Sequence, residues 1–419
     1  MYNFGTYRID IIYTNSYYDA GNVRATLNDF QSLQIIDVLN DTGSFKITST
    51  TKTRCPFQPF DGVIIYRDGV VIYTGILDKI EEEYIYKYSC WQWTVSGKNF
   101  NSILKRLLVY PDELRSNITF ANRTLSFSSY NDGLAIKEII DYNVKDGIND
   151  GSYRWNQNFH IIGAAYLKAV NYKGLTAEYR FDNVFDVVMG IANSNEYAIR
   201  PIYNPTTKKI QYYIDEPVDK SNTVIFSFDD NNLNSFKIIN EPHEETFILA
   251  SYNSDDSYTG GAMWQTVAQH PIPAPTGSWR DFKEVLWKPK KEDFQGYFTY
   301  AVLDDLARKE AENRAQTSSE YYEADINTIA GTQFIYGYEM NSARSQFTND
   351  YRLGDKIGIL VGGTTYTGKV TRMEFSVSYG KETIKPIIGD ILRGQFKGIF
   401  KNLNNLNKST TKTDNTEVS

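Results

Sequence analysis

The sequence contains few of the residues that cross-link small domains or bind metals: two cysteines, Cys55 and Cys90, and three histidines in 419 residues. A secreted scaffold held by disulfides carries more cysteines in a shorter chain. One disulfide between Cys55 and Cys90 is possible in principle. We expect instead two buried thiols.

One histidine, His243, lies between carboxylates in "EPHEE" (241–245), a composition that could suggest a metal site. The other two, His160 and His270, are far away in sequence, and the spacing matches no known ligand pattern. We therefore expect a surface turn at this point and neither a metal nor another cofactor.

The sequence also lacks long hydrophobic runs. No window approaches ~18 consecutive apolar residues, so we expect no membrane span. The N-terminus has no basic segment followed by an apolar one, which excludes a signal peptide and indicates a chain that is made and folds in a cytoplasm.

Basic residues are in the minority, with 44 Lys and Arg against 51 Asp and Glu, a net charge of −7. Sequence-independent binding of nucleic acid needs clustered Lys and Arg, so this charge balance argues against such binding. It is compatible with DNA that passes by without binding.

Motifs of common enzymes are absent as well. The sequence has no HExxH, no serine nucleophile elbow and no phosphate loop. The acidic run Glu81, Glu82 and Glu83 could suggest a glycosidase, but no partner carboxylate pair is identifiable, and charges are common on exposed strand ends. We therefore expect no enzyme.

What the chain does contain is an internal repeat. "YTGILDKIE" (73–81) returns as "YTGKVTRME" (366–374), and at this spacing of 293 residues the flanking segments 60–81 and 353–374 both read as hairpins with a glycine turn. A second pair, "FQSLQIID" (30–37) and "LNSFKIIN" (233–240), is spaced by 203 residues. The repeat indicates one small β unit used twice, with an insertion in the second copy.

Composition favours β structure, because 15% of the residues are aromatic. We expect a β-rich α+β fold in which two similar small β-barrel domains carry inserted α+β domains. We expect a first barrel that docks on a tube at 1–110 and an α+β middle domain at 111–222. A second barrel is expected in two pieces, 223–253 and 321–396, separated by an insertion with a loop and a helix at 254–320. A flexible tail is expected at 397–419.

Helices are predicted at four places. Segment 100–111 reads as a short helix that closes the first unit. Segments 131–142 and 181–194 carry an Asn or Asp cap, Asn131 or Asp132 in one and Asp182 or Asn183 in the other, and the second leads into a hairpin at 196–215. Segment 300–316 has a seam of small residues that lets a helix lie close to a sheet: Leu303, Ala307, Ala311 and Ala315.

These stretches resemble the tail-tip hub proteins of bacteriophages, a family related to the hub of contractile baseplates and to the tail-associated, lysin-like structural domain of phages of Gram-positive hosts. The resemblance rests on "GSFKI" (43–47), "YTGILDKIE", "SGKNF" (96–100) and the pattern of 351–390, and covers about three quarters of the chain. Segments 111–180 and 254–297 have no counterpart.

The resemblance implies a structural virion protein at the tail tip, assembled in the host cytoplasm as a homotrimer. Three chains with two similar domains each would match a six-fold partner, a hexameric distal tail or tail tube protein. Such a hub adapts six-fold to three-fold symmetry, lines or plugs the channel for DNA ejection, and contacts the tape-measure protein and receptor-binding or tip proteins.

The alternative is a receptor-binding tail protein that binds cell-wall carbohydrate. Trp264, Trp279 and Trp287 lie in the loop-rich insertion, and aromatic rings stack on the apolar faces of sugars. The same tryptophans could instead anchor the insertion onto its own domain or onto a neighbouring subunit. Selective binding of host walls by the isolated trimer would distinguish the two.

Overall fold

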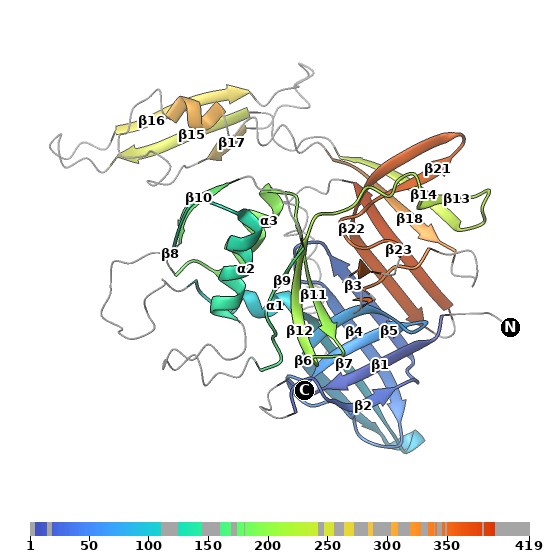
Figure 1. Cartoon of the computed structure of the whole chain (residues 1–419). Coiled ribbons are helices and arrows are strands. Elements are labelled where there is room, and N and C mark those ends of the chain that lie inside the picture. The colour runs from blue at the N-terminus through green and yellow to red at the C-terminus, as the bar shows by residue number, and fades with distance from the viewer. Residues whose placement is uncertain are drawn as a thin grey trace, which may run out of the picture. The chain divides into compact units, whose positions relative to one another are not determined.

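The computed structural model describes most of the chain, and its secondary structure is shown in Figure 1. The chain divides into two compact units, one of residues 1–237 with 323–388 and one of residues 238–322 with 389–419. The described residues are 5–14, 19–109, 125–144, 160–168, 174–179, 181–241, 247–254, 264–271, 284–287, 303–308, 319–327, 334–338, 340–341, 346–347, 350–378 and 381–389.

Most elements are strands, in agreement with the aromatic composition. The described part contains the α-helices α1 (Asn101–Leu104), α2 (Asp132–Asn143) and α3 (Val184–Ser194) and a 3-10 turn, η1 (Tyr86–Tyr88), and residues 303–308 are helical as well. The strands are β1 (Tyr7–Ile12), β2 (Val23–Leu27), β3 (Ser32–Val38), β4 (Ser44–Thr51), β5 (Gly62–Arg67), β6 (Val70–Ile85), β7 (Cys90–Asn99), β8 (Leu125–Tyr130), β9 (Tyr166–Leu167), β10 (Leu175–Tyr179), β11 (Ala198–Asn204), β12 (Lys209–Asp215), β13 (Ile225–Ser227), β14 (Leu233–Glu241), β15 (Phe247–Ser254), β16 (Trp264–Pro271), β17 (Glu284–Trp287), β18 (Ser319–Ile326), β19 (Met340–Asn341), β20 (Gln346–Phe347), β21 (Lys356–Val361), β22 (Thr364–Ser378) and β23 (Lys381–Gly389).

One large sheet organises the molecule. Its main path runs β14-β18-β23-β22-β3-β4-β7-β6-β5-β1-β2, with β21 on β22 and β13 on β21. Two groups of strands follow the same order, β3-β4-β7-β6-β5 and β14-β18-β23-β22-β21. They are joined by the antiparallel pairing of β22 with β3, in which Phe375 lies opposite Ile35, and Figure 1 shows the red and the blue strands side by side there.

Both repeated segments form the hairpins that the sequence predicts. Each has a two-residue turn with positive φ, Asp68-Gly69 in β5–β6 and Gly362-Gly363 in β21–β22, as the twist of a tight hairpin favours. At the spacing of 293 residues Tyr73 corresponds to Tyr366 and Ile65 to Gly358. Tyr73 lies opposite Ile65, whereas Tyr366 lies opposite Ile359, so the pairing registers of the two hairpins differ by one residue. A bulge in the first hairpin, between Ile65 and Tyr66, absorbs the extra residue.

The large sheet is not the pair of separate barrels that we expected. Among the described strands no sheet closes on itself, and the two groups of strands are continuous through β22. The physical reason is the length of β22, whose 15 residues pair with β21, β23 and β3. The sheet nevertheless curls, because Tyr7 and Arg67 at one side hydrogen-bond to Glu382 near the start of β23.

The middle region forms the α+β element that the sequence predicts. Asn131 caps α2, its side chain accepting from the Leu134 amide at 2.9 Å, and Asn183 caps α3 in the same way through Phe185, also at 2.9 Å. The hairpin β11–β12 follows α3. Its apolar face and those of both helices share one core, which includes Ile136, Ile139, Ile140, Val184, Val188, Ile191, Ile199, Ile210 and Ile214.

The helix expected at 100–111 is only one turn long, α1. After it the chain is extended, because Val109 donates to the Asp182 carbonyl at 2.8 Å and accepts from the Phe181 amide at 2.9 Å. Tertiary pairing with the segment before α3 therefore overrides the local helical preference.

The second unit contains the three-stranded sheet β16-β15-β17. Two of the four residues of the predicted small-residue seam, Leu303 and Ala307, are within the described residues. Residues 303–308 are helical, and Leu303 and Ala307 are fully buried with Ala250 of β15. Ala311, Ala315 and the C-terminal tail lie outside the described residues. No helix among the described residues is long and apolar enough to cross a membrane.

Candidate assembly surfaces and a buried ionic cluster

The alternation of residues along the central strands gives the large sheet one apolar and one polar face. The apolar face buries Leu33, Ile35, Phe45, Ile47, Trp93, Val95 and Phe375. The opposite face is rich in hydroxyl and amide groups, and its cross-strand rows continue from one group of strands to the other. One such row consists of Ser376, Gln34, Lys46, Ser96 and Lys79.

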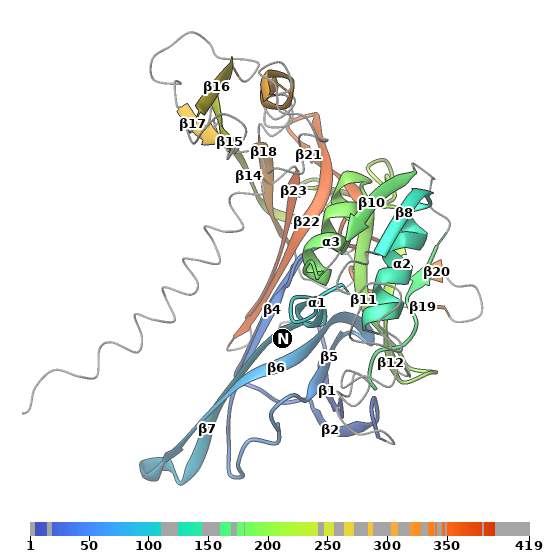
Figure 2. The same ribbon diagram turned by 90° about the vertical axis from the view of Figure 1, so that its left-hand side faces the viewer.

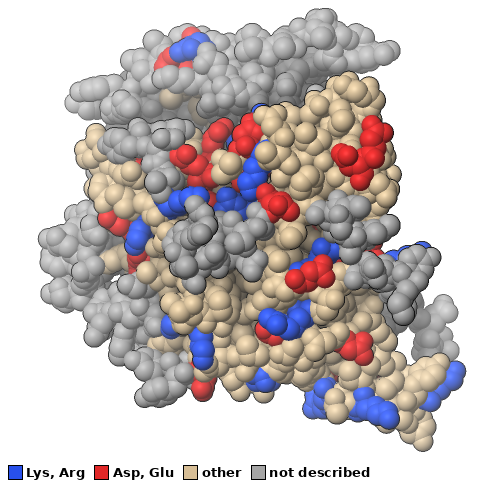
Figure 3. Space-filling view, turned by 45° about the vertical axis from the view of Figure 1, so that its right-hand side comes forward, with Lys and Arg blue, Asp and Glu red and all other residues tan. Residues whose placement is uncertain are grey.

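The acidic run of the sequence is divided between the two faces. Glu81 and Glu83 lie in register with Thr94 and Gln92 on the polar face, whereas Glu82 lies opposite Trp93 on the other. Two neighbouring pairs carry opposite charges, Lys79 with Glu81 at 2.5 Å and Arg372 with Glu374. Acidic and basic groups are likewise interspersed on the surface in Figure 3.

The hairpin of β6 and β7 extends beyond β5 as an arm, which we define as residues 78–94 (Figure 2), while β4 stays paired with β7 as far as Thr51 opposite Trp91. A loop holds it on the Glu82 side. Arg54 forms an ion pair with Glu82 at 2.5 Å, the Cys55 amide donates to the same carboxylate at 2.8 Å, and the rings of Phe57 and Trp93 are 5.7 Å apart. Through these contacts the loop of Arg54, Cys55 and Phe57 covers the face of the arm on which Glu82 and Trp93 lie.

Both cysteines lie at the arm and are free. Each is partly exposed, so the expected burial is wrong for both. The reason is their position: Cys90 begins β7 at the tip, and Cys55 lies in the covering loop.

The tip of the arm exposes aromatic rings. Tyr84, Tyr86 and Tyr88 are 47%, 87% and 67% exposed. Tyr84 also packs on Trp91 with ring centroids 5.2 Å apart, and Arg54 lies over the Trp91 ring. Exposed tyrosines on a supported projection are typical of protein interfaces.

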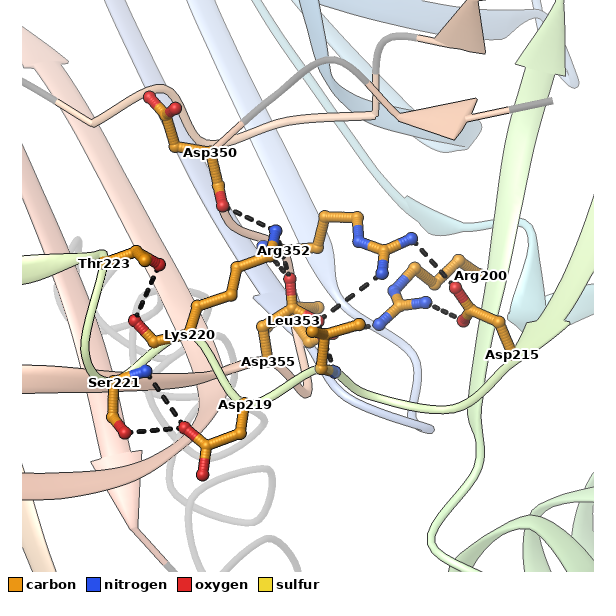
Figure 4. Close-up of polar contacts among 11 residues, drawn as sticks. Arg200, Asp215, Asp219, Lys220, Ser221, Thr223, Asp350, Arg352, Leu353 and Asp355 are labelled. Atoms are coloured by element: carbon orange, nitrogen blue, oxygen red, sulfur yellow. Dashed lines mark hydrogen bonds and ion pairs between the residues drawn. The ribbon is translucent and has the colours of Figure 1, made fainter. Parts of the chain in front are cut away.

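A buried ionic cluster connects the hairpin β11–β12 with the segment before β21 (Figure 4). Asp215 accepts from Arg200 and, at 2.8 Å, from Arg352. Arg200 also donates to the carbonyl of Leu353. Figure 4 shows the two guanidinium groups meeting at the Asp215 carboxylate.

Asp355 completes this cluster. It accepts from the Val218 amide at 3.0 Å and lies 3.1 Å from the Lys220 ammonium and 3.5 Å from Arg352. Burial raises the pKa of this carboxyl, but Arg352, Arg200 and Lys220 outweigh that effect and hold it below its usual range. Asp355 is therefore a carboxylate in the folded protein at neutral pH.

Next to the cluster lies a buried carboxyl with phenol partners. Asp37 of β3 accepts from Tyr336 at 2.8 Å and from Tyr338 at 2.7 Å. Burial raises the pKa of Asp37 to about 6, although both tyrosines and Arg200 lower it. Tyr73, which is also close enough to feel this charge, has a buried hydroxyl without a hydrogen-bond partner in the described residues.

A protein-family model decides what kind of chain this is. The model of the Siphovirus ReqiPepy6 Gp37-like proteins matches residues 12–390. The chain belongs to this family. The family takes its description from a siphovirus protein, so the chain is of bacteriophage type.

Solved structures support the fold of this family member. A 43 kDa tail protein of prophage MuSo2 from Shewanella oneidensis is 10% identical, with a TM-score of 0.56, and the match covers 92% of this chain and 96% of that one. A tail protein from Neisseria meningitidis MC58 is 13% identical, with a TM-score of 0.54 and the same coverages. No curated protein matches the chain.

The tryptophans named for sugar binding are only partly within the described residues. Trp264 begins β16 opposite Ser254, and Trp287 ends β17 next to Ala250, on the two sides of β15. Trp287 packs against the buried Leu303 and Ala307 of its own unit, as expected for an anchoring residue. Trp279 lies outside the described residues.

The other candidate chemistry has little structural counterpart. Among the described residues no three His, Cys, Asp or Glu side chains are grouped as metal ligands would be, and His243 is not among those residues. The sequence reasoning missed Arg200, Asp215, Arg352 and Asp355. Arg200 and Asp215 could have been noticed as charges in strands where apolar residues prevail.

Proposed function

We propose that this protein is the trimeric hub at the distal end of a phage tail, where it adapts a six-fold ring to a three-fold tip. The observation that carries the proposal is the repeated strand order, β3-β4-β7-β6-β5 and β14-β18-β23-β22-β21. We infer from it that the chain holds two copies of one β unit, with Tyr73 equivalent to Tyr366. Three chains then present six similar units to a hexameric distal tail or tail tube protein.

The channel wall is the finer part of this proposal. We assign it to the polar face of the large sheet, because that face continues from the first β unit into β22 of the second without an apolar residue along the row from Ser376 to Lys79. Duplex DNA must not be held there, since each neutralised phosphate adds to the binding free energy. The paired charges Lys79 with Glu81 and Arg372 with Glu374 reduce the attraction for phosphate.

Native mass spectrometry of the full chain mixed with the ring protein of the same phage tests the stoichiometry. We expect three chains of 48.1 kDa per six ring subunits. A stable monomer or dimer in the assembled complex, or six chains per ring, would overturn the proposal. Tight, salt-sensitive binding of duplex DNA by the trimer would overturn the channel assignment alone.

The carbohydrate-binding alternative for Trp264, Trp279 and Trp287 stays a prediction. Pull-down of the purified chain with host cell walls tests it, using a variant with all three tryptophans changed to alanine. Wall binding that the variant lacks would support this alternative. The contacts of Trp287 inside its own unit favour the hub.

A further inference from the structure

The arm has a free backbone edge. β6 pairs with β7 as far as Ile85, but its pairing with β5 ends at Ile76. From Asp78 to Ile85 the outer edge therefore has no strand partner among the described residues. A strand edge of this length is a template for pairing with another chain unless it is blocked.

A second free edge lies at the β14 end of the sheet path, whereas β6 lies inside that path between β7 and β5. β14, with nine residues, is its terminal strand in the described part of the chain. It contains no proline, and Ile238 is 40% exposed. Of the features by which proteins protect edges in a monomer, this strand has a charged side chain, Lys237, but neither a proline nor a short length.

The two edges are complementary in length and in charge. The free part of β6, from Asp78 to Ile85, is about as long as β14. It carries the exposed Glu81 and Glu83, whereas β14 carries Lys237, whose side chain is 65% exposed and lies 3.6 Å from Glu323 of β18, and ends at Glu241. Opposite charges on paired strands stabilise the pairing, and like charges destabilise it.

We propose that the free edge of β6 pairs with β14 of a second copy of this chain. The contact joins different surfaces of the two copies, and such a head-to-tail contact closes into a ring when the rotation per copy allows it. Eight strands per chain, from β14 to β6, would then form one continuous wall. The exposed Tyr84 lies beside this edge as an anchor. The inference rests on the proposed trimer and names its subunit contact.

Hydrogen exchange of the full chain, measured at concentrations where it is monomeric and where it is trimeric, tests this contact. We expect amides of residues 78–85 and 233–241 to become at least ten times slower to exchange in the trimer. If the trimer forms and both segments exchange as in the monomer, the inference fails while the proposed function stands. A chain that forms no trimer, alone or with its ring protein, overturns both.

Charge reversal provides a second measurement. Glu81→Lys with Glu83→Lys, and separately Lys237→Glu, should each raise the concentration needed for half-assembly about tenfold, and the combined variant should restore it. Lys46→Glu, on the same polar face but away from both edges, is the matched control and should leave assembly unchanged. Equal effects of Lys46→Glu and Lys237→Glu would contradict the assignment. Thermal melting confirms that each variant is folded.

Discussion

The guanidinium of Arg67 on β5 lies 2.7 Å from the carboxylate of Glu382 on β23, which is 315 residues later in the chain. The Glu382 side chain is fully buried, and Tyr7 of β1 donates to it as well. This contact, rather than a backbone ladder, holds the two sides of the curled sheet together.

Glu382→Gln should therefore destabilise the protein by about 3 kcal/mol, because it removes the buried counter-charge of the largely buried Arg67. Denaturant unfolding measures the loss. Asp68→Asn is the matched control, since Asp68 also pairs with Arg67 but is 53% exposed. A loss no greater than that of Asp68→Asn would show that the clamp contributes little.

The buried Asp37 should give the protein an unusual pH dependence. Its folded pKa of about 6 is above the ordinary value of 3.8, so the folded state binds the proton more tightly than the unfolded state does. Its contribution is fully present below pH 4 and is lost as pH rises through 6, a change of about 3 kcal/mol.

Asp37→Asn tests this, because the amide oxygen still accepts from Tyr336 and Tyr338 and carries no charge. The variant should be the more stable protein at pH 8 and should lose the dependence between pH 4 and 6. Melting temperatures across that range measure it. A parallel pH profile for both proteins would refute the role of Asp37.

Removing one carboxylate from the ionic cluster should lower the free energy of unfolding. Asp355→Asn leaves Lys220 without its buried carboxylate, and Arg352 keeps only its pair with Asp215, so the change should cost about 3 kcal/mol. Because the pKa of Asp355 is lowered, its stabilisation is present above pH 4 and is lost at lower pH. Asp219→Asn changes a nearby exposed carboxylate that pairs with Lys356, and should have a much smaller effect.

Two substitutions at helix α3 should change the stability of the protein in opposite directions. Asn183→Ala removes the cap that accepts from Phe185 and should cost about 1 kcal/mol. Gly190→Ala, at an exposed helical position where a Cβ meets nothing within 4 Å, should stabilise by about 0.5–1 kcal/mol. Thermal unfolding of the two variants measures both, and a shift of the same sign in each would contradict the local explanation.

Local features of the fold were predictable from the sequence because they depend on neighbouring residues. The two hairpins follow from alternation and glycine turns, and the caps at Asn131 and Asn183 follow from residue type. The single turn of α1 was not predictable, since the extended segment after it depends on pairing with Asp182 far along the chain.

The same distinction applies to the candidate surfaces. Alternation could have assigned Glu81 and Glu83 to one face and Glu82 to the other. Nothing local indicates that Asp355 meets Arg200 and Lys220, or that Asp37 meets two tyrosines about 300 residues away, because these contacts depend on how remote segments pack.

The pairing of β3 with β22 determines the order in which the fold can be completed. β3 is synthesised near the beginning of the chain, while β22 begins only at Thr364. Until β22 has left the ribosome, one edge of β3 has no native partner, so closure of the sheet is a late step between distant segments. Truncation before residue 364, by a nonsense mutation or by proteolysis of the nascent chain, therefore releases a product that can pair through β3 with other chains and aggregate.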